Sequence, residues 1–223
     1  MIDVSRLKHV CELPVEAFAA FGEVVGTPGG NYVFRDQGER VLGVAHLDTV
    51  LNGTPFIHDG ERVYCPALDD RLGVHLLLDV LPLLGVRFDL LLTEGEEQGC
   101  STARWFQPPK KYNWMFSFDR AGTDVVLYQY DTTANRRLLH RAGFRVGTGS
   151  YSDIADLWFL GGGGFNFGCG YHRQHRLDCY ADLRETKRMV AGFVGFWQRN
   201  AGRWLPHQSD GVRPSVGQRY SAC

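Results

Sequence analysis

The sequence predicts an α/β protein, a three-layer αβα sandwich around a mostly parallel mixed sheet. Short runs rich in apolar and β-branched residues alternate along the chain with segments of helical period, which indicates strands packed between helices. The run Phe88–Leu92 is largely apolar and is flanked by charged and turn residues, as is typical of a buried parallel strand. The chain has 223 residues, 44% of them hydrophobic, which is enough for one domain with a full core.

The expected domain spans residues 1–205, and the polar, turn-rich residues 206–223 are expected to form a C-terminal tail. The net charge is −1, so no overall field favours nucleic acid or an anionic membrane as a partner. No apolar run is as long as a transmembrane helix, and the N-terminal residues lack the apolar middle of a signal peptide. We therefore expect a cytoplasmic protein.

Strands in the first half are indicated by apolar runs between turn residues. They are expected at Asn31–Asp36, Glu39–His46 and Phe88–Thr93, with a hairpin at 55–58 and 62–64 around the turn at 59–60. Pro14–Phe21 is interpreted as a short helix and Gly26–Gly30 as a loop. A longer helix is expected from Asp69 to about Leu81, because acidic residues suit a helix N-terminus and proline and glycine follow its end.

The second half continues the alternation. Strands are expected at Trp114–Phe118, Val125–Tyr128 and Phe165–Phe167, and helices at Gly99–Phe106, Ala134–Arg141, Ser152–Leu160 and Glu185–Asn200. Ser152 is a candidate N-cap, and the last helix carries its apolar residues on one face. Gly161–Gly164 is interpreted as a mobile connector.

Two adjacent carboxylates, Glu96 and Glu97, follow the buried run in the segment TEGEEQG. The carboxyl edge of an open α/β sheet is where ligands bind. Neighbouring carboxylates repel each other unless a cation lies close to them. An acidic pair alone is more typical of a solvated loop, so its meaning depends on the other residues at that edge.

Other acids and histidines occupy similar points. His46 closes a strand, Asp119 follows one, Asp69 begins a helix and His175 lies in a loop before the last helix. One or two histidines with several carboxylates suit zinc, cobalt or manganese. Paired ions about 3.5–4 Å apart activate water and hold the oxyanion that forms when it attacks a carbonyl. A glutamate that does not bind metal can then transfer the proton.

The motifs VAHLDTV, ALDDRLG, TEGEEQG, FSFDRAG and GYHRQHRLD, in this order, resemble those of the co-catalytic zinc metallopeptidases. That superfamily includes aminopeptidases, carboxypeptidases and N-deacylases, and the resemblance covers about residues 31–200. It implies two bound divalent ions, most simply Zn²⁺, with Co²⁺ or Mn²⁺ as alternatives. It also implies a small peptide or an N-acyl amino acid as substrate.

The resemblance gives a role to each motif residue. It makes Glu96 the general base, and Asp48 the residue that orients the His46 ring. It implies that Asp69 bridges both ions and that the Asp69–Asp70 peptide bond is cis, as is frequent in the proteins this chain resembles. The implied metal ligands are His46, Asp69, Glu97, Asp119 and His175.

Two alternatives concern the last ligand. His172 competes with His175, which is favoured because an acid, Asp178, follows it by three residues as in the superfamily. His172 would then contact substrate or be a plain loop histidine. Cys169 with these two histidines (CxxHxxH) resembles a structural zinc set, but no second cysteine pair accompanies it.

Five residues near the motifs are weaker candidates for binding substrate: Arg71, Arg120, Tyr151, Asp153 and His172. Each arginine could hold a neighbouring carboxylate or bind a substrate carboxylate, and the former role is favoured. Tyr151 and Asp153 belong to a segment that resembles the loop bordering the active site in this superfamily.

The chain also departs from many members of the superfamily. Residues 120–174 are too few for the lid or dimerisation domain of many carboxypeptidases and aminoacylases, and residues 47–68 are too few for the insert of the large tetrahedral aminopeptidases. The expected domain organisation is a catalytic domain without a lid or insert, as in the single-domain bacterial aminopeptidases.

The leading hypothesis is a two-metal hydrolase of amide or peptide bonds, most simply an aminopeptidase. The alternatives are an N-acyl amino acid deacylase or carboxypeptidase, and a metal-binding interaction module without catalysis. Nucleotide binding is not favoured, because no GxGxxG follows the first strand. A cysteine hydrolase would keep its activity under chelation, unlike a metal enzyme.

Overall fold

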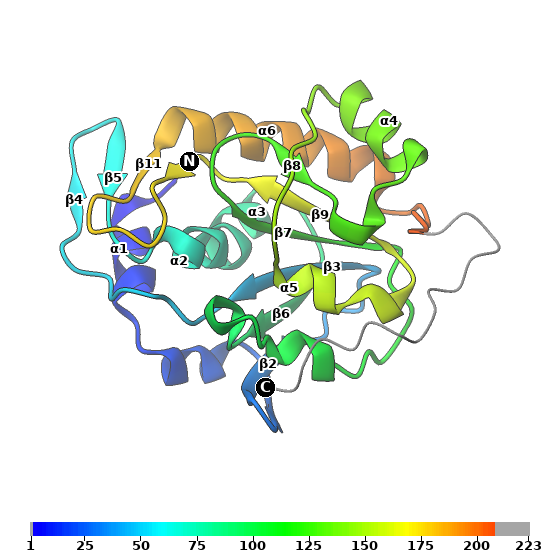
Figure 1. Cartoon of the computed structure of the whole chain (residues 1–223), viewed down its shortest axis with the longest axis horizontal. Coiled ribbons are helices and arrows are strands. Elements are labelled where there is room, and N and C mark those ends of the chain that lie inside the picture. Colours follow the sequence, from blue (N-terminus) through cyan, green and yellow to red (C-terminus); the bar gives the residue numbers. More distant parts are fainter. Residues whose placement is uncertain (1, 208–223) are drawn as a thin grey trace.

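Seven strands form the central sheet, in the order β1-β2-β6-β3-β7-β9-β8 (Figure 1). The computed structural model describes residues 2–207. The four middle strands, β6, β3, β7 and β9, are parallel, and the flanking pairs are antiparallel. The strands are β1 (Glu23–Thr27), β2 (Gly30–Arg35), β3 (Val41–His46), β6 (Asp89–Thr93), β7 (Trp114–Arg120), β8 (Val125–Val126) and β9 (Gly163–Gly168).

A second, smaller sheet lies beside the first and has the order β10-β11-β5-β4. Its strands are antiparallel and short: β4 (Ile57–His58), β5 (Arg62–Tyr64), β10 (Tyr171–His172) and β11 (Tyr180–Asp182). The expected hairpin thus forms, and β11 extends it by pairing Tyr180 with Tyr64. The loop between β10 and β11 carries the candidate ligand His175.

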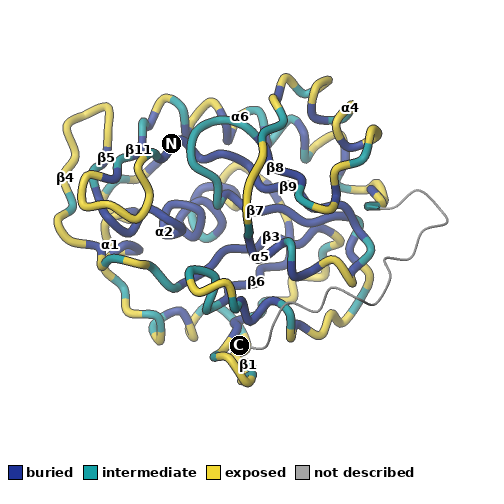
Figure 2. The backbone as a smooth tube through the Cα atoms, in the orientation of Figure 1, coloured by how far each residue is buried: buried dark blue, intermediate teal, exposed yellow. Residues whose placement is uncertain are grey.

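Helices cover both faces of the central sheet. One face packs against α1 (Val4–Glu12), α2 (Leu68–His75) with its continuation to Leu83, and α6 (Leu183–Asn200). The other face packs against the 3₁₀ turn Thr102–Trp105 and α5 (Asp153–Asp156). A further helix, α4 (Thr133–Arg141), buries Leu139 against the α6 side. In Figure 2 the strands β3, β6, β7 and β9 run through the buried centre. The expected three-layer αβα sandwich is confirmed.

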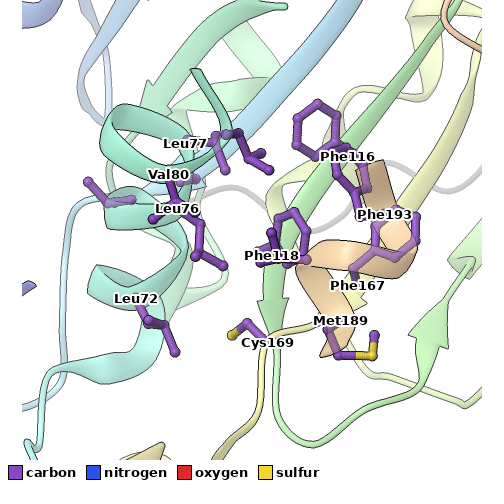
Figure 3. Close-up of a cluster of buried hydrophobic side chains, with 14 of the residues drawn as sticks. Leu72, Leu76, Leu77, Val80, Phe116, Phe118, Phe167, Cys169, Met189 and Phe193 are labelled. Atoms are coloured by element: carbon purple, nitrogen blue, oxygen red, sulfur yellow. The ribbon is translucent and has the colours of Figure 1, made fainter. Parts of the chain in front are cut away.

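Aromatic side chains fill the layer between the sheet and α6. The ring of Phe193 on α6 lies 4.5 Å from that of Phe116 and 5.0 Å from those of Phe118 and Phe167. Figure 3 shows these rings meeting between β7, β9 and α6, with Leu72 of α2 and side chains of its continuation, such as Leu76 and Val80, on the opposite side of the cluster. Truncating one such buried ring costs about 3–5 kcal/mol, so this cluster fixes the strands whose ends carry the candidate site.

Four expected local structures differ from those observed. Residues Gly26–Gly30, interpreted as a loop, instead belong to the β1-β2 hairpin, with a tight turn at 28–29. Gly163 and Gly164, interpreted as part of a mobile connector, instead lie inside β9 and are buried. Glycine is required at 164, because a Cβ there would stand 2.5 Å from the Tyr130 ring. The helix expected at Ser152–Leu160 is two short turns, and that at Gly99–Phe106 is a 3₁₀ turn.

Some features at the chain ends were not expected or fall outside the described residues. The helix α1 was not predicted, although Asp3 caps it by accepting the backbone N–H of Ser5 and Arg6. Pro206, at the start of the expected tail, forms a bridge with Gly162. The rest of that tail, residues 208–223, lies outside the described residues. Within the described part, the helices are all too short or too polar to cross a membrane.

Candidate metal centre

Five distant segments bring the motif residues together at the carboxyl edge of the parallel strands. His46 is the last residue of β3, Asp119 lies near the end of β7, and Asp69 begins α2. Glu96 and Glu97 form a 3₁₀ turn directly after β6. His175 comes from the loop between β10 and β11. The expected convergence is therefore present, although Asp119 lies within its strand and not after it.

The carboxylate of Asp69 lies between the two histidines. Its Oδ1 is 3.4 Å from Nε2 of His46, and its Oδ2 is 3.2 Å from Nε2 of His175. Each end of this carboxylate also has an acidic neighbour. Asp119 lies 3.5 Å from His46 Nε2, and Glu97 lies 2.9 Å from His175 Nε2. The arrangement is two adjacent groups of ligand atoms with Asp69 shared between them.

These distances fit divalent metal ions. Two ligand atoms about 2.1 Å from a tetrahedral ion lie about 3.4 Å apart, close to the separations seen here. Nε2 of His46 and Oε1 of Glu97 are buried and have no hydrogen-bond partner, as expected of atoms that donate to a metal. The ligand atoms of His46, Glu96 and Asp119 lie within 4.8 Å of one another, and so do those of His46, Asp69 and Glu97. The donor set therefore fits a pair of ions.

The peptide bond between Asp69 and Asp70 is cis, as the resemblance implied. The side chain of Asp70 is fully buried, and neither of its oxygens has a hydrogen-bond partner among the described residues. Burial, followed by the charge of Asp119, raises the pKa of Asp70 well above its usual range. Gly73 packs directly on this carboxyl group, because a Cβ there would lie 2.0 Å from its Oδ1.

The turn that carries the two glutamates needs glycine at both ends. Gly95 and Gly99 have φ angles of 83° and 69°, in the left-handed region that favours glycine. A Cβ at Gly95 would also stand 2.6 Å from the carbonyl oxygen of Cys100. The sequence GEEQG therefore suits a tight turn that presents adjacent carboxylates to the edge of the sheet.

Polar groups hold Asp119 in place. The hydroxyl of Ser152 donates to its Oδ2 at 2.9 Å. The side chain of Asn166 on β9 accepts the backbone N–H of Asp119 at 3.1 Å and donates to its carbonyl oxygen at 2.9 Å. Ser152 was a candidate N-cap; it occupies that position, but its hydroxyl makes no capping hydrogen bond. Its role is to orient Asp119.

The electrostatics of the cluster follow from many buried groups of like charge. Burial, and then the charge of Asp119, raises the pKa of Glu96 to about 9. Burial, and then the charge of Asp69, raises the pKa of Glu97 to about 7. Burial alone would lower the pKa of His46, but the nearby carboxylates of Asp119, Asp48 and Asp69 outweigh it and raise this pKa well above the usual value. A pocket that stabilises protons so strongly also attracts metal cations.

Two expected substrate-binding residues do not reach the cavity. Arg71 is 4% exposed and packs inward, where it donates to the carbonyl oxygen of Val10 at 3.1 Å and lies over the Phe18 ring. Asp153 is 1% exposed and accepts hydrogen bonds from Ser101 and Thr93 behind the site. Both side chains lie on the interior side of their short helices, so their place beside site residues in the sequence does not carry them into the pocket.

The remaining expected residues lie at or near the cavity. Tyr151 lines it, and its hydroxyl donates to Asp156 at 2.6 Å. Arg120 lines it and is paired with Asp124. His172 does not belong to the cluster: its ring lies 2.7 Å from Glu185 and is stacked on Tyr180.

Three side chains of the alternative CxxHxxH set have separate partners. The Cys169 thiol is buried and directed at the Arg120 carbonyl oxygen, at 3.8 Å. His172 contacts Glu185, and His175 contacts Asp69 and Glu97. The described residues therefore place His175, and not a thiolate-containing set, at the candidate centre.

A cavity of about 300 Å³ opens above the cluster. Two tyrosines that the sequence analysis missed, Tyr128 and Tyr171, form part of its wall. Tyr128 donates to the Tyr151 carbonyl oxygen at 2.9 Å, whereas the hydroxyl of Tyr171 has no hydrogen-bond partner among the described residues. Tyr171 directly precedes the HRQH segment, but a lone tyrosine carries no sequence pattern that would have singled it out.

Solved structures of peptidases have the same architecture. Aminopeptidase PepT from Bacillus cereus aligns with 86% of this chain and 96% of its own chain, at 10% identity and a TM-score of 0.63. A tripeptidase from Staphylococcus aureus aligns with 88% and 98%, at 11% identity and a TM-score of 0.64. The chain shares the fold of these peptidases. An aminopeptidase from the archaeon Desulfurococcus kamchatkensis aligns with 95% of this chain and 94% of its own, at 13% identity and a TM-score of 0.58.

By sequence alone the chain has no such match. No protein-family model matches it, and a search of curated proteins finds no significant similarity. The likeness to the solved structures therefore concerns the fold, and the activity has to be argued from the residues of the site.

Proposed function

We propose that the protein is a two-metal hydrolase of peptide or amide bonds in small substrates, most simply an exopeptidase of the aminopeptidase type. The observation that supports it best is the Asp69 carboxylate, whose two oxygens lie 3.4 Å and 3.2 Å from the Nε2 atoms of His46 and His175. His46 and Asp119 would hold one ion, His175 and Glu97 the other, and Asp69 would bridge them. Zn²⁺ suits this mixed set of imidazole and carboxylate ligands, as do Co²⁺ and Mn²⁺.

Bound ions of this kind would supply a water of lowered pKa, about 7, and polarise the carbonyl of the scissile bond. Glu96 is the residue placed to move the proton. Its carboxylate is 13% exposed and lies 3.8 Å from His46 Nε2, at the edge of the cluster and in the wall of the cavity. In this proposal Glu96 takes the proton of the attacking water and gives it to the leaving nitrogen.

The size of the cavity favours a small substrate. About 300 Å³ lies at the lower limit of typical ligand pockets, so a short peptide or a single acylated amino acid fits better than a long chain. By its name, the tripeptidase of the same fold acts on a short peptide. We further propose a cytoplasmic location, which rests on the sequence expectation.

A second candidate function is favoured by one residue. Arg120 lines the cavity, and its guanidinium group suits a substrate that has a free carboxylate. An N-acyl amino acid deacylase or a carboxypeptidase would use such a group, whereas an aminopeptidase acting on long peptides would not need it.

The proposal is tested by metal content and turnover together. The purified protein is stripped with a chelator, reconstituted separately with Zn²⁺, Co²⁺ and Mn²⁺, and assayed for bound metal by mass spectrometry. Each form is then incubated with short peptides and N-acyl amino acids. We expect about two ions per chain and hydrolysis that chelation abolishes and metal restores. Bound metal without hydrolysis across the panel would instead support an interaction module.

A further inference from the structure

The cavity above the candidate metal centre contains one cation that has no part in metal binding. Among the described residues that line it, the charged ones are Asp69, Glu96, Glu97, Asp119, Arg120 and His175. All but Arg120 are proposed ligands or the proposed base. No acid therefore remains in this cavity to bind a substrate ammonium group, and Arg120 is the group available to bind a charged part of the substrate.

The position of Arg120 is fixed by its strand and by an ion pair. It ends β7 and directly follows Asp119, so the strand holds its backbone beside the metal centre. Its Nε donates to Oδ1 of Asp124 at 3.0 Å and its Nη2 to Oδ2 at 3.3 Å. This bidentate pair fixes the plane of the guanidinium group but uses only part of its donors. The side chain is 29% exposed, so the remaining N–H groups are accessible to a ligand.

A second cavity, of about 440 Å³, shares Arg120 and Ala121 with the first. Arg145 also lines this second cavity, and its side chain has no hydrogen bond or ion pair among the described residues. The carboxylate in its wall is that of Asp124. Two arginines and one carboxylate therefore line this second cavity, and this local excess of positive charge favours an anion next to the metal centre.

We propose that Arg120 binds the free carboxylate of the substrate on the leaving-group side of the scissile amide. The substrate class is then a dipeptide or an N-acyl amino acid, in which a single carbon separates the scissile nitrogen from the carboxylate. That short separation agrees with the position of Arg120, which lines the same cavity as Asp119 and Glu96. This inference rests on the proposed hydrolase function and narrows its substrate.

The test compares two substrates that differ only in the carboxylate: glycyl-leucine and glycyl-leucinamide. For the zinc-reconstituted wild type we expect kcat/KM to be about tenfold to 100-fold higher for the acid, because hydrogen bonds to charged groups contribute about 1.5–3 kcal/mol. Arg120→Gln should remove this advantage by lowering kcat/KM for the acid while the value for the amide stays similar. Wild-type enzyme that cleaves the amide as well as the acid would overturn the proposal.

Asp124→Asn is the matched control, because it breaks the same ion pair but keeps the cation. It should retain the preference for the acid. Loss of the preference in Asp124→Asn as well would show that this ion pair positions the guanidinium group for binding, whereas an unchanged preference in Arg120→Gln would overturn the proposal. Circular dichroism and thermal unfolding of both variants exclude a folding defect as the reason for lost activity.

A binding measurement separates this inference from the proposed function. The Glu96→Gln variant, with and without Arg120→Gln, is titrated calorimetrically with both compounds, so that turnover is not needed. Tighter binding of the acid that disappears with Arg120→Gln supports the carboxylate site even if the wild type hydrolyses nothing, in which case the hydrolase proposal alone fails. Equal binding of acid and amide by Glu96→Gln overturns the carboxylate site, whatever turnover shows.

Discussion

The carboxylate of Asp48 accepts the backbone N–H of Glu97 at 3.1 Å. Its other oxygen accepts the N–H of Glu96 at 3.3 Å, and its carbonyl oxygen lies 2.9 Å from Nδ1 of His46. The sequence analysis expected Asp48 to orient the His46 ring. In the structure, the Asp48 carbonyl oxygen contacts the ring instead, since the carboxylate lies 3.6 Å from Nδ1. The carboxylate holds the turn that carries the two glutamates. One residue thus aligns parts of both proposed metal sites.

Asp48→Asn should therefore weaken metal binding without touching a ligand. The amide keeps the shape of the side chain but presents an NH₂ group to one backbone N–H, so the turn loses an acceptor. We expect metal affinity to fall about 10–100-fold, as is typical when a residue that supports ligands is changed, measured by competition with a chromophoric chelator. Asp59→Asn is the control, because Asp59 also accepts two backbone N–H groups, from Glu61 and Arg62, but in an exposed turn. Equal metal affinity of the two variants would refute this role.

Glu96→Gln should abolish turnover and leave the metal in place. Glutamine fills the same space but cannot accept the proton of water, and loss of a general base costs about 10²–10⁴-fold in rate. The rate and the bound metal are measured on the same preparation. Glu94→Gln is the matched control: Glu94 lies two residues earlier and accepts the N–H of Asn31 at 3.2 Å, so its variant should keep its activity. Wild-type rates in Glu96→Gln would show that another group is the base.

His175→Ala and His172→Ala should differ in metal content. The His175 ring lies 2.9 Å from Glu97 and 3.2 Å from Asp69, whereas the His172 ring contacts Glu185. Removing His175 should lower the bound metal by about one ion per chain, because a site that loses a ligand binds weakly. His172→Ala should keep both ions. A loss of metal on changing His172 alone would reverse the assignment of the last ligand.

The fold could be predicted where a single segment carries its own pattern. The apolar run of β6 and the periodic apolar residues of α2 and α6 are buried as expected. Prediction failed where contacts with residues distant in the sequence determine the local conformation. Gly163 and Gly164 suggest a flexible loop by composition, yet they lie in a buried strand, where Tyr130 packs at the Cβ position of Gly164 and the Leu205 carbonyl oxygen at that of Gly163. No local feature of four consecutive glycines reveals these contacts.

For the candidate site, the positions of residues along the chain could be predicted, but the directions of their side chains could not. Convergence of His46, Asp69 and Asp119 followed from their positions at strand ends and at a helix start. The direction of a side chain did not follow, because residues adjacent in a helix point to different faces. Arg71, two residues after Asp69, therefore packs into the core against Phe18 instead of entering the cavity.

In the absence of metal, the free energy of unfolding of the protein should fall as the pH rises from about 5 to about 9. Burial raises the pKa of Glu96 to about 9 and that of Glu97 to about 7, and the neighbouring carboxylates raise the pKa of His46. In this window these groups hold more protons in the folded protein than in the unfolded chain, so the free energy of unfolding falls as the pH rises. Groups with lowered pKa, Asp48 and Asp69, act only at lower pH. The loss should exceed about 1.4 kcal/mol, the equivalent of one pKa unit.

Zinc should reverse this trend, because metal binding requires deprotonated ligands and becomes stronger as they lose their protons. Urea unfolding at about pH 5, 7 and 9, with chelator and with Zn²⁺, measures both slopes. The chelated variant with Glu96→Gln and Glu97→Gln serves as control: it lacks the two titrating carboxyl groups, so its stability should depend less on pH. If the chelated wild type is as stable at about pH 9 as at about pH 5, the pKa values of the cluster are not raised in the folded protein. The electrostatic reason for the cluster to attract cations would then be absent.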